Sequence, residues 1–197
     1  MTIPPPPTEP PAPPITDAMR ARARANPGKW MYEIDPAFDP NGAVPPWGIK
    51  GGWEVDQRGD LVRWVRNPNY RPSPRTLGMY QPENPAEAAL QNAATGYGPE
   101  EALLTALLDT PLAVLAHPQR PGLYVEPDPD SRGVVTAYTS PRRLPTDWPG
   151  YQLITGRQLA AELPGGLLRL NPTARPSVTL PLDEVGAAGT SAEDRPS

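Results

Sequence analysis

Proline is the residue that most constrains this chain, because 32 of its 197 residues are Pro and 17 more are Gly. Pro lacks a backbone N–H and fixes φ, so it interrupts helices and the interior of sheets. Eight of the prolines fall within residues 4–14. Such a segment favours an extended polyproline II conformation and cannot build a packed core. We expect a disordered, solvated tail there, and its Pro-x-x-Pro spacings leave open docking on an aromatic groove of a partner.

The chain has no Cys and a single His, His117. Zinc-thiolate sites, disulfides and Cys nucleophiles are therefore excluded. Any Ser-His-Asp triad would have to use His117, which stands before Pro118 with no Ser or Asp motif around it, so we interpret it as a surface residue. The loop over residues 35–42 lacks carboxylates at the spacing that a calcium loop requires. The sequence predicts no metal, no cofactor and no enzymatic activity.

Net charge and hydropathy limit the classes of partner that this chain is expected to bind. The formal net charge is −4 and the pI about 5.1, so the chain as a whole is not attracted to nucleic acid or to an anionic membrane. The N-terminus has no basic region followed by an apolar one, and no stretch approaches ~18 apolar residues. We expect a cytoplasmic protein that inserts into no membrane.

The first half is expected to be β-rich. Residues 1–28 form the Pro-rich tail and a short helix over 18–25, with Thr16 as the N-cap and Asn26-Pro27-Gly28 as the stop signal. Residues 29–82 hold four of the five Trp residues and predict a small β unit. Its strands are expected at 30–34, 47–55 and 61–66, and Gly59 suits the hairpin loop between the last two.

Residues 83–186 are expected to form a mixed α/β domain. Asn84-Pro85-Ala86-Glu87 is a well-formed helix start, with Asn84 as the N-cap. A second helix from Pro99 carries a Leu stripe at helical spacing. Strands are predicted at 112–116, 122–125, 134–139, 167–170 and 177–180, with a helix at 157–163. Residues 187–197 are expected to be disordered, and the whole is an α+β protein.

The pattern Asn-Pro-x-x-Arg-Pro-Ser occurs twice, at residues 67–73 and 171–177. Asn-Pro ends a strand in either copy, because Pro cannot donate to the ladder. An alternative is that Arg71 and Arg175 line paired binding surfaces. Two copies also hint that the two halves are distant repeats of one strand-turn unit.

The Trp-rich unit is the most promising contact surface, because Trp is enriched at interface hot spots. Trp47, between Pro46 and Gly48, is expected to be the best exposed. A small domain poor in Leu and Ile can also use Trp as core, and this composition favours burial of the rings over a contact role. The predicted partner-binding residues are Trp47, Trp53, Trp64, Tyr70, Arg71 and Arg175.

Several runs resemble a known family. Residues 30–39, 44–47, 67–78 and 94–99 look like the type VII secretion system-associated proteins of actinobacteria, with Asn-Pro-x-Tyr-Arg-Pro-Ser-Pro as the most specific part. The second half resembles the SseB-like (enhanced serine sensitivity) domain, through residues 107–109, 138–140, 151–164 and 170–172. Together the resemblance spans residues 26–185.

The resemblance implies an α+β fold and a link to type VII secretion, without an established reaction. We therefore expect a cytosolic accessory, adaptor or chaperone-like protein that binds a protein or peptide, with type VII secretion components or substrates as partners. Nucleic acid is not expected as a partner. The alternative is a module that senses an amino-acid-like small molecule, which the SseB-like link suggests.

Overall fold

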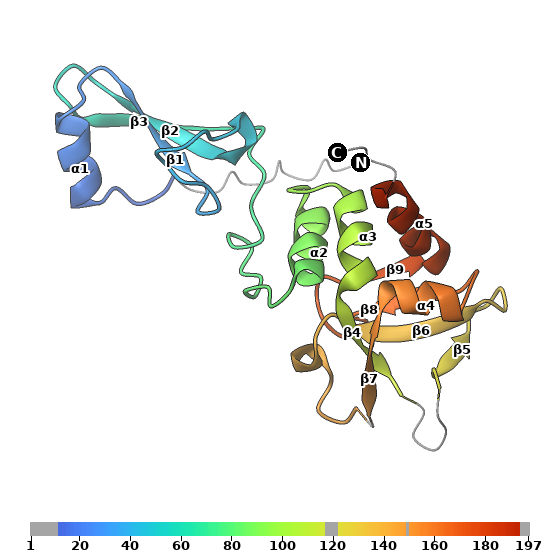
Figure 1. Ribbon diagram of the computed structural model, residues 1–197. Coiled ribbons are helices and arrows are strands. Elements are labelled where there is room, and N and C mark those ends of the chain that lie inside the picture. Colours follow the sequence, from blue (N-terminus) through green and yellow to red (C-terminus); the bar gives the residue numbers. More distant parts are fainter. Residues whose placement is uncertain (1–11, 117–121, 149, 194–197) are drawn as a thin grey trace, which may run out of the picture. The chain divides into compact units, whose positions relative to one another are not determined.

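The computed structural model describes residues 12–116, 122–148 and 150–193 (Figure 1). The chain divides into two compact units, unit 1 up to Pro72 and unit 2 from Ser73 onwards. Each unit has its own sheet and its own hydrophobic core. The predicted α+β class is confirmed. The predicted proline tail falls mainly on residues 1–11, which lie outside the described residues, as does His117.

From residue 12 onwards, where its description begins, unit 1 forms a three-stranded antiparallel sheet with one helix. Its elements are α1 (Asp17–Arg24), β1 (Trp30–Ile34), the 3-10 turn η1 (Pro46–Gly48), β2 (Ile49–Val55) and β3 (Leu61–Arg66). The strand order is β1-β2-β3. The Thr16 hydroxyl accepts a hydrogen bond from the Met19 backbone N–H, as expected of an N-cap.

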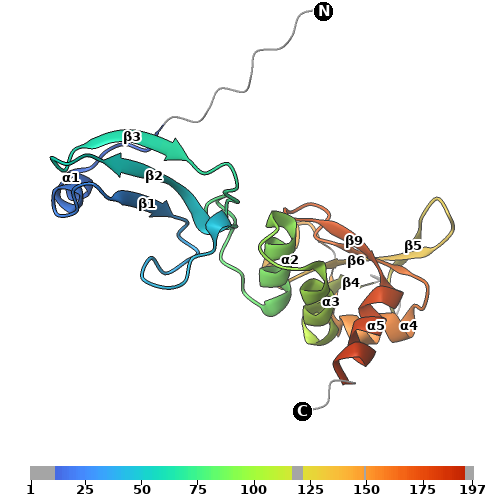
Figure 2. The same cartoon turned by 90° about the horizontal axis from the view of Figure 1, so that it is seen from above.

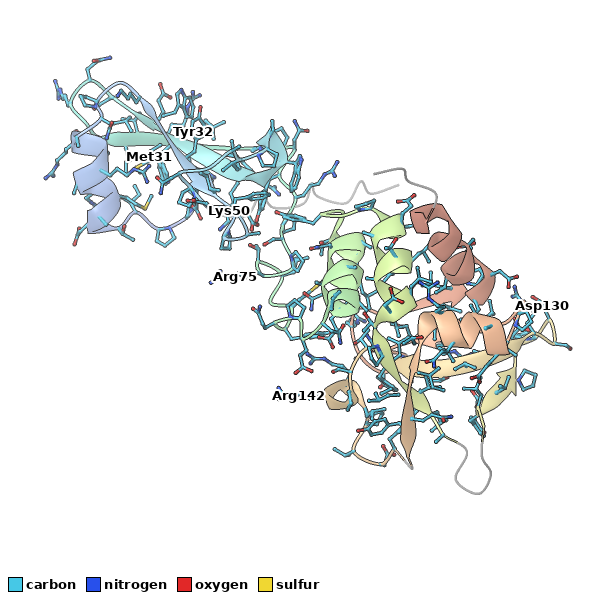
Figure 3. All side chains as sticks on the ribbon, in the orientation of Figure 1. Met31, Tyr32, Lys50, Arg75, Asp130 and Arg142 are labelled. Carbon is cyan, nitrogen blue, oxygen red and sulfur yellow. The ribbon has the colours of Figure 1, made fainter. Side chains whose placement is uncertain are left out.

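The core of unit 1 lies on the face of the sheet that α1 covers. Met31 stands opposite Trp53, and Trp53 stands opposite Trp64, so the three side chains share that face. Met31, Trp53 and Val55 are buried there with Ala23 of α1, and the Trp53 and Trp64 ring centroids are 5.6 Å apart. Successive side chains of a strand alternate between the two faces, so Tyr32 points away from this core (Figure 3).

The β2–β3 hairpin is held by Asp56. Its carboxylate accepts hydrogen bonds from the backbone N–H groups of Arg58, at 2.8 Å, and Asp60, at 2.9 Å. The Asp60 bond is the main cause that lowers the pKa of Asp56. Gly59 has a φ of +84°, and a Cβ there would stand 2.7 Å from the Arg24 Cα, so the turn requires glycine.

The described residues of unit 2 form a six-stranded mixed sheet with four helices. The helices are α2 (Pro85–Thr95), α3 (Glu100–Asp109), α4 (Gly156–Glu162) and α5 (Leu182–Glu193), and η2 (Pro141–Arg143) is a 3-10 turn. The strands are β4 (Pro111–Leu115), β5 (Val125–Pro127), β6 (Gly133–Tyr138), β7 (Tyr151–Thr155), β8 (Leu167–Leu170) and β9 (Val178–Pro181). The order is β7-β4-β6-β8-β9, with β5 paired to β6.

A single apolar core joins these elements. Only β6 and β8 pair in parallel among the strand pairs of the described residues, and the chain between them passes through η2, the edge strand β7 and helix α4. The four helices gather over one face of the sheet (Figures 1 and 2). The fully buried members of the core include Leu107 of α3, Leu112 of β4, Leu159 of α4, Leu170 of β8 and Val185 of α5.

Two elements were missed, and two expectations differ from the structure. Strand β7 and helix α5 were not predicted from the sequence. The segment 187–197 was expected to be disordered, but α5 continues to Glu193 because Val185 and Leu182 anchor the helix in the core. The division between the units falls after Pro72, whereas the sequence suggested Pro82.

The proposed internal repeat is also wrong. Asn171 is fully buried with a φ of +52°, whereas Asn67 follows a strand of unit 1 and is not among the residues with positive φ. The two backbones therefore differ at the first residue of the shared pattern. The same sequence pattern therefore follows two strands with different backbone conformations.

We predict that Gly51→Ala destabilises unit 1 by about 1–3 kcal/mol, because overpacking of a filled core costs this much. A Cβ at Gly51 would stand 2.5 Å from Cζ2 of Trp64 and 2.6 Å from the Val65 carbonyl oxygen. Urea unfolding followed by Trp fluorescence measures the change. Gly42→Ala is the matched control, since its Cβ would meet no atom closer than 3.5 Å. Equal midpoints for the two variants would contradict the prediction.

Candidate functional site

Two of the predicted contact residues belong to the core of unit 1. Trp53 is only 8% exposed, and the half-buried Trp64 packs against it. The Trp53 ring fills the space between the sheet and α1, so partner binding by Trp53 stays a prediction that its burial does not favour. Burial of these two rings follows the alternative stated from the sequence.

Trp47 is half-buried, so the expectation that it is the best exposed Trp is also wrong. Its ring meets the edge of Phe38 at 5.3 Å between centroids, with 70° between the planes. Its backbone carbonyl accepts a hydrogen bond from the Arg71 N–H at 2.9 Å. Trp47 thus helps to fix the loop that precedes β2.

The first copy of the Asn-Pro pattern braces that same loop. The Asn67 side-chain amide donates to the carbonyl oxygens of Pro46, at 2.6 Å, and Ile49, at 2.7 Å. The Tyr70 hydroxyl donates to the fully buried carboxylate of Asp35 at 2.7 Å. These contacts hold the turn η1 against the end of β3.

The braced turn forms one end of an open aromatic face. Trp30, Tyr32 and Val65 are 43%, 54% and 39% exposed, on the side of the sheet opposite to the core. They surround a cavity of about 300 Å³. We call this surface the aromatic face; its lining residues are Trp30, Tyr32, Pro46, Ile49, Gly51, Gly52, Val65, Arg66 and Asn67.

Gly52 sets the shape of the aromatic face. It pairs with Tyr32 on one side and with Val65 on the other, and a Cβ there would stand 3.1 Å from both Trp30 and Tyr32. Without that Cβ, the two rings lie close to the floor of the cavity. They are nearly parallel, with 14° between the planes and 6.4 Å between the centroids.

Sequence reasoning missed Trp30 and Tyr32, although one signal was present. Residues 30 and 32 are two apart in a predicted strand, so they had to share a face. The second observation needed was the pairing of β1 with β2, which sets Tyr32 opposite Gly52. The sequence alone does not predict this register between β1 and β2.

The two predicted arginines are exposed, Arg71 in unit 1 and Arg175 in unit 2. Since the surrounding backbones differ, no duplicated surface supports pairing them. Arg66 instead is the cation at the aromatic face. It makes no ion pair within the described part of the chain, whereas its neighbour on the same strand, Arg63, pairs with Glu54 at 3.0 Å.

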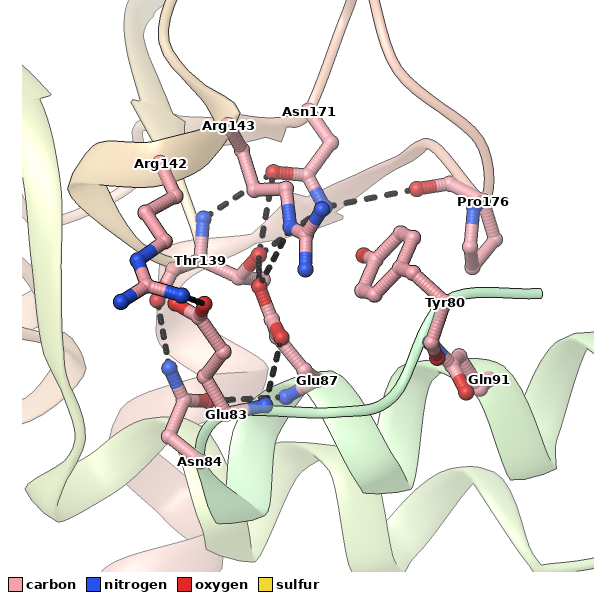
Figure 4. A network of polar contacts seen from close by, with 10 residues as sticks. All are labelled: Tyr80, Glu83, Asn84, Glu87, Gln91, Thr139, Arg142, Arg143, Asn171 and Pro176. Carbon is pink, nitrogen blue, oxygen red and sulfur yellow. Dashed lines mark hydrogen bonds and ion pairs between the residues drawn. The ribbon is translucent and has the colours of Figure 1, made fainter.

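Unit 2 contains a buried polar network around Glu87 (Figure 4). The Glu87 side chain is fully buried and accepts hydrogen bonds from the Thr139 hydroxyl, at 2.9 Å, and from Nε of Arg143, at 3.0 Å. The Glu83 backbone N–H donates to its second oxygen at 2.8 Å. The Arg143 guanidinium also lies 3.3 Å from the centre of the Tyr80 ring. The carboxylate is thus fully engaged.

The network ties four segments together. Asn171, which follows β8, accepts the Thr139 backbone N–H at 3.0 Å, and Asn84 donates to the Thr139 carbonyl at 2.8 Å. Thr139 follows β6 and Arg143 ends η2. The arrangement therefore joins the start of α2 to the ends of β6 and β8. Because the charges of Glu87 and Arg143 pair with each other, we interpret the network as a structural element that holds these segments together, and we call it the Glu87 lock.

The ionisation of Glu87 follows from these contacts. Burial by itself would raise the pKa of Glu87, but the Arg143 hydrogen bond, the Glu83 N–H and the Thr139 hydroxyl together outweigh it and hold the pKa below its ordinary value of 4.5. Burial raises the pKa of Tyr80, and the Glu87 charge acts in the same direction. Glu87 is therefore an anion at neutral pH.

Within the described ranges, no group of three or more Asp, Glu or His side chains is arranged to hold a metal ion. In that same part of the chain, none of the helices is both long enough and apolar enough to span a bilayer. Comparisons with protein-family models, with curated proteins and with solved structures give no match to this chain.

We predict that Glu87→Gln lowers the free energy of unfolding of unit 2 by about 3 kcal/mol at neutral pH, because it leaves the half-buried Arg143 charge without its partner. The folded pKa of Glu87 is lowered, so its stabilisation is present above the ordinary value of 4.5 and is lost as the pH falls through the folded pKa. The difference between wild type and variant should therefore shrink on acidification. Urea midpoints across this range measure it.

Asp109→Asn is the matched control. The Asp109 carboxylate is 81% exposed and pairs with Arg157 at 3.4 Å, so its loss should cost less than about 1 kcal/mol. A Glu87→Gln variant as stable as Asp109→Asn at neutral pH, or one whose deficit grows in acid, would contradict the lock.

Proposed function

We propose that this chain is a non-enzymatic accessory or adaptor protein that binds a protein or peptide partner through the aromatic face of unit 1. The observation that carries the proposal is the pair Trp30 and Tyr32, which stand exposed over Gly52 on a sheet face that no described element of unit 1 covers. Exposed apolar patches with such rings are typical of interaction sites.

The aromatic face has the properties of a recognition surface. Trp and Tyr supply large contact areas at low entropic cost, and they are enriched among interface hot spots. The strand register fixes both rings, and Asn67 fixes the turn that closes one end. A site that is already shaped before binding loses less entropy when a partner arrives.

The biological setting of the proposal comes from the sequence resemblance. The run over residues 67–74 is the most specific part of the likeness to type VII secretion system-associated proteins, and its first residue, Asn67, braces the aromatic face. We accordingly assign the partner to the components or substrates of an actinobacterial type VII secretion system. The chain acts in the cytoplasm in this proposal, and unit 2 corresponds to the SseB-like domain.

The first test compares partner capture by two variants. We expect that the full-length double variant Trp30→Ala/Tyr32→Ala loses type VII secretion components that the wild type recovers from native cytosol after mild cross-linking. Loss of one central aromatic hot spot costs 2 kcal/mol or more, so recovery should fall at least ~10-fold. Mass spectrometry measures the recovery.

Tyr151→Ala is the control, because Tyr151 is 45% exposed but belongs to β7 of unit 2. It should recover the same components as the wild type. Equal recovery by the double variant and this control would refute the role of the aromatic face. Capture of no secretion component by any of the proteins would refute the type VII assignment.

A second candidate function is the sensing of an amino-acid-like molecule, and one cavity of unit 2 favours it. This cavity measures about 220 Å³ and lies among α2, α3 and β9. Leu90, Leu103 and Leu180 give it apolar walls, while Glu100 and Glu184 place carboxylates beside it. An apolar pocket with acidic groups suits a side chain and an ammonium group.

A thermal-shift panel of amino acids tests this alternative. We expect a bound amino acid to raise the midpoint of unfolding with its concentration, by mass action on the native state. Leu104→Trp, which fills the cavity, should abolish the shift. No shift with any amino acid at concentrations up to about 10 mM removes the sensing function, since this corresponds to binding weaker than about 3 kcal/mol.

A further inference from the structure

We propose that an extended peptide segment of the partner protein pairs with the outer edge of β1 as a fourth strand of the unit 1 sheet. Two of its side chains, one apolar and one acidic, enter cavities on the α1 side of β1. This binding mode rests on the proposed function of the aromatic face, and it specifies which peptides unit 1 takes. The backbone of β1, the cavities beside it and the charges around them each support it.

One edge of β1 pairs with no strand of the described chain. The strand order is β1-β2-β3, so β2 occupies only one side of β1 (Figure 2). The Val55 backbone N–H donates to the Lys29 carbonyl at 3.2 Å, so Lys29 bonds toward β2. Alternate residues of an antiparallel strand bond to the same side, and Met31 therefore bonds toward β2 as well. The backbone N–H and C=O groups of Trp30 and Tyr32 consequently point to the outer edge, where a further strand can pair with them.

The outer edge of β1 is suited to strand addition. Trp30 to Glu33 pair regularly with β2, and the register shifts only after Glu33. The strand contains no Pro, a residue that many proteins place on edge strands to prevent pairing. Peptides that add a strand to such an edge gain affinity from main-chain hydrogen bonds, and pockets for alternate side chains supply specificity. Two such pockets lie beside β1.

The first pocket is an apolar cavity of about 430 Å³ on the α1 side of the sheet. Met19 of α1, Met31 of β1 and Trp53 of β2 give it apolar walls. Tyr32 and Glu33 also line it, so the cavity follows three consecutive residues of β1. Cavities of about 300–1,000 Å³ accommodate small ligands, and this one accommodates a large apolar side chain of a peptide on the edge.

The second pocket is a smaller cavity of about 110 Å³ at the start of β1. Arg22 and Met31 line both cavities, so the two are neighbours. Lys29 and Asn26 also line the smaller cavity, and its described lining includes no Asp or Glu. Neither Arg22 nor Lys29 forms an ion pair within the described residues. Charge complementarity therefore selects an acidic side chain at this end of the edge.

The spacing along β1 converts the two cavities into a sequence pattern. Side chains on one face of a strand recur every second residue, roughly 7 Å apart, and Lys29 and Met31 have this spacing. The sheet of unit 1 is antiparallel throughout, and an added strand that continues this arrangement runs opposite to β1. The bound segment then reads apolar-x-acidic. The residue x pairs with Trp30, and its side chain lies on the aromatic face.

The test uses the full-length protein and a fluorescein-labelled peptide, Ser-Gly-Thr-Leu-Val-Glu-Thr-Gly-Ser, whose Leu-Val-Glu carries the pattern. Tyr32→Ala and Tyr32→Pro both remove the ring, but only Pro also removes the outward N–H, a change that edge strands tolerate. We expect Tyr32→Pro to bind the peptide about 5-fold more weakly than Tyr32→Ala, the effect of losing one hydrogen bond. Fluorescence anisotropy measures both affinities. Equal affinities of the two folded variants would overturn strand addition.

Modified peptides supply a second arm that leaves the protein unchanged. N-methylation of the peptide Val removes the N–H that pairs with Trp30 and should weaken binding to the wild type by about 5-fold. N-methylation of the peptide Glu is the control, because its N–H points away from β1 in the antiparallel register. Equal losses for the two peptides would contradict the proposed pairing.

The charge requirement is tested separately. Arg22→Gln should weaken binding of the Leu-Val-Glu peptide by about 3-fold at low salt and leave binding of a Leu-Val-Gln peptide unchanged. Arg20→Gln is the matched control, because Arg20 is exposed on the same helix but lines neither cavity. An equal effect of Arg22→Gln on both peptides would overturn the acidic position of the pattern.

Other outcomes separate strand addition from the proposed function. If no Leu-Val-Glu peptide binds while Trp30→Ala/Tyr32→Ala still loses the secretion components, the aromatic face keeps its function and strand addition fails. If the peptide binds as described but the double variant captures those components like the wild type, the proposed function fails and the edge site stands. If the wild type self-associates and Tyr32→Pro alone abolishes this in sedimentation velocity, a second copy occupies the edge, which overturns binding of a partner segment there.

Discussion

A three-stranded sheet has two faces, and the described part of unit 1 has one eight-residue helix to cover them. The period of two along β1 directs Met31 toward α1, so its neighbours Trp30 and Tyr32 have to point the other way. Packing on the helix side thereby fixes the rings on the open side. The exposed aromatic pair is a geometric consequence of how the small core is built, and its rigidity comes from that core.

In unit 2 the corresponding constraint is electrostatic. The charge of Glu87 is fully buried and that of Arg143 is half-buried at the junction of α2, η2 and the ends of β6 and β8. An ion pair in such a place adds little net stability over apolar packing, but it disfavours alternative arrangements that would leave either charge alone. We infer that the pair specifies how α2 docks. This explains why polar residues occupy the centre of an otherwise apolar junction.

Local signals in the sequence predicted the local structure well. Thr16 and Asn84 mark helix starts by side-chain bonds to the nearby backbone, and the hairpin between β2 and β3 is marked by Asp56 and Gly59, whose turn bonds are local. The failures depend on distant partners. Trp30 is exposed and Trp53 buried because of cross-strand pairing, and Asn67 and Asn171 share letters but not surroundings. Helix α5 lacked a strong apolar stripe, since Gly189 lies close to Leu108 and a small residue fits there.

The two adjacent glycines of β2 make room for side chains on opposite faces of the sheet. Gly51 makes room for Trp64 on the helix side, and Gly52 makes room for Trp30 and Tyr32 on the open side. A side chain at position 51 disturbs the core, whereas a side chain at position 52 changes the shape of the aromatic face. A substitution at Gly52 can therefore change this surface without entering the core, one residue away from a position where an added side chain costs stability. Within this dipeptide, Gly51 is required by the packing of the core, whereas residue 52 can vary with the ligand that the aromatic face binds.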